Sequence, residues 1–143
     1  MNGDFVMHNI AQPKGASTLY KWKSVLSIEK GAMALMEQHF PNTVKLPVIG
    51  NNDVMDHDQM PCTMTEHNIY FSQLFDAWFP TSNKISNRAE IQRTFLQGGF
   101  YRHDFAGKSS SLLALNTMYF MIENQCMLNK TNEQLDWFET QLI

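Results

Sequence analysis

The sequence Leu-Pro-Val-Ile-Gly-Asn-Asn-Asp at residues 46–53 joins a short apolar run to a polar turn. A continuous apolar run of this length is typical of a buried strand, and Pro47 is tolerated near the end or at the edge of a strand. We therefore predict a strand over residues 44–49, with three polar side chains at its carboxyl end. The alternative is a polar turn without chemistry, because Asn and Asp are common turn residues.

Hydrophobic spacing predicts the elements on both sides of this turn. The expected elements are helices over residues 18–39, 65–78 and 88–96, antiparallel strands over residues 100–105 and 110–117, and a final helix from residue 132 or 133. Helices that alternate with strands in this way favour the α/β class, with layered packing.

Composition limits the possible classes of protein. At 143 residues, with 43% hydrophobic and 12% aromatic residues, the chain has the length and content of one folded domain. The net charge of −3 gives no electrostatic footprint for nucleic acid. The apolar runs are far shorter than the roughly 20 residues of a transmembrane helix, so no membrane span is expected in this chain.

Two sequence features bear on the cellular compartment. Cys62 and Cys126 are too far apart for a zinc knuckle or a redox pair, and we favour free or separately paired thiols over a mutual disulfide. Asn129-Lys130-Thr131 is an N-glycosylation sequon, which predicts a glycoprotein if the chain is secreted. Such triplets also occur by chance, so the compartment stays open.

Five motifs occur in a recognisable order. They are Gly-Asp-Phe-Val-Met-His at residues 3–8, Gly-Asn-Asn-Asp at 50–53, Gly-Gly-Phe-Tyr at 98–101, Leu-Ala-Leu-Asn-Thr at 113–117 and Gln-Leu-Asp-Trp-Phe at 134–138. In this order they resemble the calcineurin-like metallophosphoesterases, and most closely the acid sphingomyelinase-like and endopolyphosphatase branch. The resemblance covers nearly the whole chain.

The resemblance implies a fold in which two β-sheets form a sandwich flanked by helices. Enzymes of this kind also need an upstream Asp-x-His motif and downstream Gly-His and Gly-His-x-His segments, which the chain lacks. We therefore expect residues 1–143 to be a partial catalytic domain, an internal segment that is inactive on its own.

The resemblance also implies a site for two divalent metal ions, either zinc, manganese or iron. Asp4 would bridge the ions and Asn51 would offer its amide oxygen to one of them. Asp4 and Asn51 should then converge, although 46 residues separate the two motifs. Without the other motifs, an Asx-turn or a cap would be the default explanation for Asp4.

The candidate catalytic residues are Asn52, Asp53 and His8. Asn52 stands where most of the superfamily has His, and an amide cannot donate a proton at neutral pH, so it would hydrogen-bond a phosphoryl oxygen instead. His8 matches a histidine that this branch carries after its Gly-Asp pair. His57 is a possible phosphate contact, with a surface histidine beside carboxylates as the alternative.

Taken together, the motifs predict a segment of a dinuclear phosphoesterase that hydrolyses phosphodiester or phosphoanhydride bonds with a metal-activated water. Its substrate would be a phosphate compound such as a phospholipid head group, a nucleotide or polyphosphate. The resemblance implies a secreted, lysosomal or vacuolar location. The alternative is a non-catalytic protein, a truncated or degenerate paralogue that keeps the fold for packing or interaction.

Overall fold

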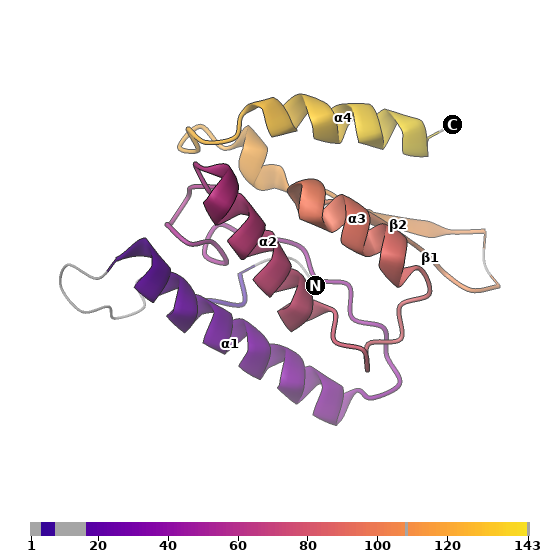
Figure 1. The fold of residues 1–143 in the computed structure, drawn as a ribbon. Coiled ribbons are helices and arrows are strands. Elements are labelled where there is room, and N and C mark those ends of the chain that lie inside the picture. The colour runs from indigo at the N-terminus through magenta and orange to yellow at the C-terminus, as the bar shows by residue number, and fades with distance from the viewer. Residues whose placement is uncertain (1–3, 8–16, 108, 143) are drawn as a thin grey trace.

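A computed structural model describes residues 4–7, 17–107 and 109–142 of the chain. Its elements follow the order α1, α2, α3, β1, β2, a short 3-10 helix η1 and α4 (Figure 1). The mixture of helices with a small sheet is compatible with the expected α/β class. None of the helices in the described ranges is long and apolar enough to cross a membrane.

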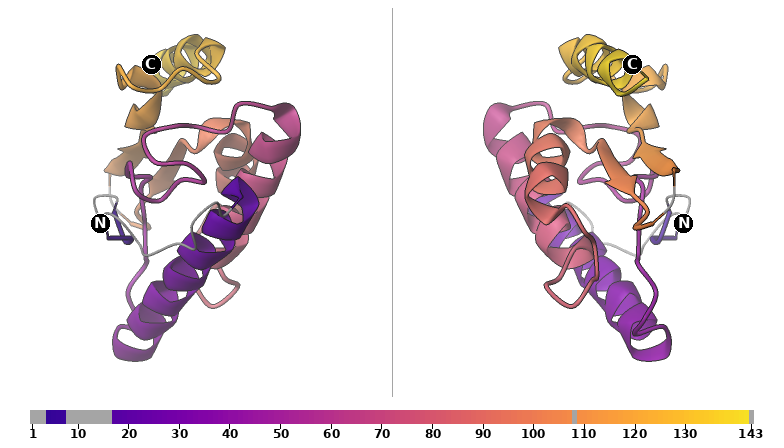
Figure 2. Two further views of the ribbon diagram at one scale, coloured as in Figure 1. Left: turned by 90° about the vertical axis from the view of Figure 1, so that its left-hand side faces the viewer. Right: turned by 90° about the vertical axis from the view of Figure 1, so that its right-hand side faces the viewer.

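The long helix α1 spans Thr18–His39, as the apolar spacing predicts. The Ser17 side chain caps its first turn by accepting the Tyr20 N–H at 3.3 Å. Its buried residues fall three, four or seven positions apart on one face: Trp22, Val25, Leu26, Glu29 and Met33. This face packs against α2, as Figure 2 shows from the side.

Helices α2 (Met64–Trp78) and α3 (Arg88–Gly98) confirm the second and third predicted helices. A capping box formed by Thr63 and Glu66 starts α2. Gly99 ends α3 in the left-handed conformation, at φ 79°.

The largest core side chains are aromatic and gather around Phe95 of α3. Its ring contacts five others at centroid distances of 5.5–6.3 Å: Phe71, Phe75, Trp78, Phe79 and Tyr101. Edge-on and tilted contacts of this kind add to the free energy gained by burial. This aromatic cluster fixes α2, α3 and the first strand relative to one another.

The predicted antiparallel strands are present as a hairpin, β1 (Tyr101–Asp104) with β2 (Ser111–Ala114). Tyr101 pairs with Ala114 and Asp104 pairs with Ser111. The 3-10 helix η1 (Thr117–Phe120) and helix α4 (Asn129–Gln141) follow, and α4 lies above α3 and the hairpin in Figure 1.

Three of the sequence motifs meet at the buried side chain of Asn116. Its amide nitrogen donates to the Gly98 carbonyl at 3.0 Å. Its backbone N–H donates to Gln134 Oε1 at 2.7 Å, and Gln134 Nε2 donates back to the Asn116 carbonyl at 3.2 Å. Buried amides need such partners, so these residues join the end of α3, the segment after β2, and α4.

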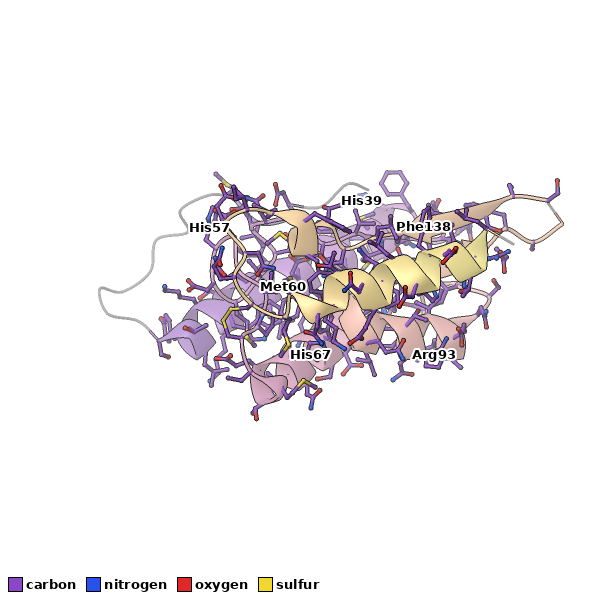
Figure 3. All side chains as sticks on the ribbon, turned by 90° about the horizontal axis from the view of Figure 1, so that it is seen from above. His39, His57, Met60, His67, Arg93 and Phe138 are labelled. Carbon is purple, nitrogen blue, oxygen red and sulfur yellow. A yellow bond between two sulfur atoms is a disulfide. The ribbon has the colours of Figure 1, made fainter. Side chains whose placement is uncertain are left out.

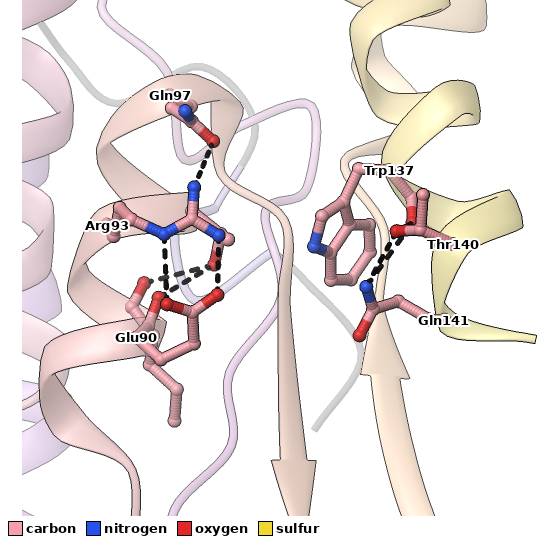
Figure 4. A network of polar contacts seen from close by, with 8 residues as sticks. Glu90, Arg93, Gln97, Trp137, Thr140 and Gln141 are labelled. Atoms are coloured by element: carbon pink, nitrogen blue, oxygen red, sulfur yellow. Dashed lines mark hydrogen bonds and ion pairs between the residues drawn. The ribbon is translucent and has the colours of Figure 1, made fainter.

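Helices α3 and α4 carry separate polar networks (Figure 4). On α3, Arg93 forms an ion pair with Glu90, three residues earlier. On α4, the Thr140 hydroxyl donates to the Trp137 carbonyl at 2.6 Å. The Trp137 ring packs on Phe100 with 4.8 Å between centroids, which ties α4 to the end of α3.

The strand predicted over residues 44–49 is wrong, since this segment joins no sheet in the described part of the chain. Burial does alternate along it, at Lys45, Pro47 and Ile49. Side chains take the place of a neighbouring strand: Asn83 bonds both the N–H and the carbonyl of Lys45, and the Tyr101 hydroxyl donates to the Pro47 carbonyl at 2.7 Å. The segment is therefore extended and half-buried without ladder hydrogen bonds.

The expectation of free or separately paired thiols is also wrong, because Cys62 and Cys126 form a disulfide with 4.7 Å between their Cα atoms. The loops that carry them are held together independently. Met60 N–H donates to Asn124 Oδ1 at 3.0 Å, and Gln125 N–H donates to Gln59 Oε1 at 2.9 Å. These contacts bring together residues 64 and 66 positions apart, which spacing in the sequence cannot reveal.

The disulfide predicts a measurable loss of stability on its removal. Cys62→Ser or Cys126→Ser should lower the free energy of unfolding by about 2–4 kcal/mol, because the reduced unfolded chain gains conformational freedom. Denaturant unfolding measures this loss. A reducing agent should cause the same loss in the wild type, but it should have no effect on the variant that carries both substitutions. Equal stability of the wild type with and without reductant would contradict the bond.

Candidate metal site

The Asp4 segment and the Gly-Asn-Asn-Asp turn at residues 50–53 are joined by hydrogen bonds between backbone N–H groups and carboxylates. Asp4 Oδ1 accepts the Asn52 N–H at 3.0 Å, and Asp53 Oδ2 accepts the Asp4 N–H at 2.7 Å. Each motif thus supplies a carboxylate to the backbone of the other, across 48 and 49 positions of sequence. This reciprocal pair brings the Asp4 segment to the turn at residues 50–53.

Gly50 allows this close approach because it has no side chain. A Cβ at this position would lie 2.3 Å from the Asp4 backbone nitrogen and 2.4 Å from Asp4 Oδ1. Both distances are far below any real contact. The glycine of the Gly-Asn-Asn-Asp motif is therefore required by packing against Asp4, whatever the chemistry of the site.

Asp53 is fully buried, and its carboxylate serves the backbone around it. Oδ2 accepts N–H groups from Asp4 and from Gly50, the latter at 2.9 Å, while Oδ1 accepts the Val6 N–H at 3.3 Å. The Tyr70 hydroxyl of α2 donates to the Asp53 carbonyl at 3.0 Å. These contacts place Asp53 behind the turn, and the catalytic role considered for it stays a prediction.

Asn51 is oriented by a residue that the sequence patterns did not single out, Asp58. Asn51 Nδ2 donates to Asp58 Oδ1 at 2.9 Å, and His57 Nδ1 lies 2.6 Å from Asp58 Oδ2. The amide nitrogen is thereby directed at a carboxylate, and the amide oxygen remains the atom able to face a cation. The imidazole is held by the same carboxylate, an arrangement that commonly fixes the orientation of a functional histidine.

Asp4 and Asp58 both have left-handed backbones, with φ of 58° and 61°. Residues other than glycine adopt this conformation rarely, although Asp is among those that tolerate it. Such conformations persist only where the surroundings enforce them, and they cluster at functional sites. Two of them on either side of the turn at residues 50–53 indicate that this local structure is tightly specified.

Asp4 and Asn51 line one cavity of about 570 Å³. Its polar part comes from these two residues with Gly50 and Thr117, and its apolar wall comes from Val48, Ile49, Leu115, Met118 and Met121. The predicted ligands therefore open into a shared space beside an apolar surface. The sequence motifs gave no signal for the apolar wall, because its members come from two segments far apart in the chain, residues 48–49 and 115–121.

A divalent ion is compatible with the donors at this cavity, although the described residues supply only part of a ligand set. A carboxylate and an amide oxygen are both accepted by hard and borderline cations. No group of three or more His, Cys, Asp or Glu side chains suited to a metal occurs among the residues the structure describes. His8, one of the three candidate catalytic residues, lies outside the described residues.

Three of the described histidines differ in burial. His67 and His103 are buried, and burial lowers the pKa of each below the usual range. His67 also bonds the Gln97 carbonyl at 3.2 Å, in keeping with a role in packing. His57 is half-exposed and lies well away from Arg93 and Phe138 at the other end of the molecule (Figure 3).

Comparison with known proteins identifies relatives of the expected kind, although no family model matches the chain. A rat cyclic GMP-AMP phosphodiesterase, SMPDL3A, is 29% identical over 122 residues, which are 83% of this chain and 26% of the relative. In this region the chain is similar in sequence to a phosphodiesterase. Sphingomyelinase phosphodiesterase D of Dictyostelium discoideum is 27% identical over 73% of the chain and 22% of its own length. The endopolyphosphatase of Schizosaccharomyces pombe is 26% identical over 82% of the chain and 20% of its own length.

These relatives confirm the resemblance drawn from the order of the five motifs, at low identity over most of the chain. Their names describe hydrolases of phosphodiesters or of polyphosphate. The chain spans about a quarter of the length of the curated relatives it matches.

Gly50 provides a sharp test of the contact between the two motifs. Gly50→Ala should lower the free energy of unfolding by roughly 1–3 kcal/mol, because the added methyl group displaces the Asp4 segment. Gly31→Ala in α1 is the matched control: a Cβ there meets nothing within 4 Å, and replacing a helical glycine should stabilise the protein by about 0.5–1 kcal/mol. Denaturant unfolding measures both, and equal effects of the two substitutions would contradict the docking of Asp4.

Proposed function

We propose that this chain is part of the catalytic domain of a dinuclear metal-dependent phosphoesterase that hydrolyses phosphodiester or phosphoanhydride bonds. The observation that carries the proposal is the convergence of Asp4 and Asn51 on one cavity, held by reciprocal carboxylate bonds between their motifs. The names of the relatives support the reaction class. Their greater length supports a larger domain, the two-sheet sandwich that the resemblance implies, of which residues 1–143 form a part.

In this proposal Asp4 and Asn51 hold the ions through oxygen atoms. The chemistry that two divalent ions supply when bound is Lewis-acid polarisation of the phosphoryl group and activation of water. The protein's own contribution is to fix the ligands in place. Asp58 orients Asn51 by accepting a hydrogen bond from its amide nitrogen. Hydrogen bonds to the turn at residues 50–53 orient Asp4.

We propose that Asn52, His57 and His8 contact the substrate. Asn52 is largely buried, and its side-chain amide can donate a hydrogen bond to a phosphoryl oxygen without transferring a proton. His57, which is paired with Asp58, is the proposed phosphate contact, and His8 is retained as a catalytic candidate on the motif alone. A phosphoanhydride leaving group needs less protonation than an alkoxide, so the lack of a histidine at position 52 suits a polyphosphate or nucleotide anhydride substrate.

The proposal predicts a loss of activity on substitution of the two ligands. In the product of the complete reading frame, Asp4→Asn and Asn51→Ala should each lower metal-dependent turnover of a chromogenic phosphodiester or of polyphosphate by at least roughly 100-fold, since loss even of an outer-shell partner costs 10–100-fold. Titration calorimetry with manganese or zinc should show weaker binding in parallel. Asp136→Asn on the exposed face of α4 is the matched control and should change neither quantity.

The 143-residue chain on its own should hydrolyse nothing, because Asp4 and Asn51 leave each ion short of ligands. Metal-dependent activity of this chain that disappears in Asp4→Asn would show that the site is complete without further motifs. A complete gene product that binds no metal and hydrolyses no phosphate ester would support the non-catalytic alternative.

A further inference from the structure

The sequon Asn129-Lys130-Thr131 forms the first turn of helix α4. Asn129 is exposed, and its amide Nδ2 donates to Glu133 Oε1, one turn further along the helix, at 3.3 Å. An amide nitrogen that carries a sugar still has one N–H group to donate. A modified Asn129 can therefore keep its bond to Glu133, and an attached glycan would extend into solvent.

A disulfide lies close to this sequon in the sequence. Cys126, three residues before Asn129, is bonded to Cys62. Disulfides form and persist in oxidising compartments, and they are rare where cellular reductants keep thiols reduced. Sequons serve as glycan acceptors in secreted proteins, which fold in the same oxidising compartments. The disulfide and the sequon thus indicate one cellular environment.

We propose that Asn129 is an N-glycosylation site, and that its glycan is attached before α4 and the disulfide have formed. In this step the Asn129 amide nitrogen forms a bond to the anomeric carbon of an oligosaccharide carried on a lipid pyrophosphate. The bond between that carbon and the pyrophosphate oxygen breaks, the lipid pyrophosphate leaves with the electron pair, and the amide loses one proton to solvent. Nothing is oxidised or reduced. The proposal does not rest on the phosphoesterase reaction.

The order of events follows from the position of Thr131 in the folded protein. Only Ser or Thr serves at the third position of a sequon, so the hydroxyl is the group that marks the triplet. In the structure this hydroxyl donates to the Tyr119 carbonyl of η1 at 3.2 Å, and Thr131 is partly buried. The group that a transferring enzyme must recognise is therefore already bonded once α4 has packed on η1.

The backbone of the sequon is also fixed in the folded protein. The Lys130 N–H donates to the Met127 carbonyl at 2.9 Å, and the Thr131 N–H donates to the Leu128 carbonyl at 3.2 Å. Acceptor sequons are expected on surface loops, whereas this one lies in a helical turn. The disulfide just upstream ties the same segment to the loop before α2. The sequon can therefore enter the active site of an enzyme as a flexible chain only before these contacts form.

The first experiment uses the product of the complete reading frame made in eukaryotic cells. After reduction, a protease that cuts after glutamate releases residues 124–133 of the chain. Removal of glycans by peptide N-glycosidase in isotope-labelled water should convert Asn129 to Asp that carries the heavy oxygen. Mass spectrometry of this peptide detects the change. An unmodified Asn129 would overturn the assignment of the site.

Variants separate the role of the sequon from that of the fold. Asn129→Gln and Thr131→Ala should both lose the glycan, whereas Thr131→Ser keeps a hydroxyl and should remain glycosylated. Asn132→Gln is the matched control: Asn132 is exposed on the same helix, but neither Ser nor Thr stands two positions after it. This variant should keep the glycan on Asn129. A glycan that survives Thr131→Ala would overturn the proposal.

The order of events has its own test. The complete protein is made without glycans and is then given to an oligosaccharyltransferase with a lipid-linked oligosaccharide. The oxidised, folded protein should be modified at Asn129 at least about tenfold more slowly than the reduced, unfolded protein, because only molecules in which the start of α4 has opened locally can be modified. A synthetic peptide of residues 124–133 should react like the unfolded protein. Equal rates for the folded and the unfolded protein would overturn the proposed order.

Discussion

The buried carboxylate of Asp53 is the constraint on which the region around the candidate site depends. It accepts hydrogen bonds from the backbone of two segments that are almost 50 residues apart, and its own carbonyl is held by Tyr70 from α2. A carboxylate can accept several N–H groups at once, which a neutral side chain of the same size cannot do. The convergence of Asp4 and Asn51 on one cavity therefore follows from a single buried side chain in the interior.

The helices follow from local sequence, whereas the links between distant segments do not. The apolar spacing in residues 18–39 marks α1 because burial on one face repeats with the period of the helix. Residues 44–49 misled the prediction, since a short apolar run looks the same in the sequence whether a neighbouring strand or the side chains of Asn83 and Tyr101 bond the backbone. The disulfide was missed because it depends on loops that only tertiary structure brings together.

The residues of the candidate site also differ in whether the sequence alone could predict them. The order of short motifs predicts Asp4, Asn51 and the turn as parts of the site. It also predicts the kind of relative that the comparison identifies. Asp58 could not be predicted, because an Asp in a loop is an ordinary residue until its partner is known. Its importance comes from the Asn51 amide, from which it accepts a hydrogen bond.

The disulfide between Cys62 and Cys126 also determines how cleavage of the chain by a protease would be detected. It encloses α2, α3 and the hairpin in one covalent loop. A protease that cut the exposed turn between β1 and β2 would leave two pieces joined through sulfur. Electrophoresis without a reductant would then report an intact molecule, and only reduction would release the pieces, so the apparent resistance of this protein to proteolysis depends on how the sample is prepared.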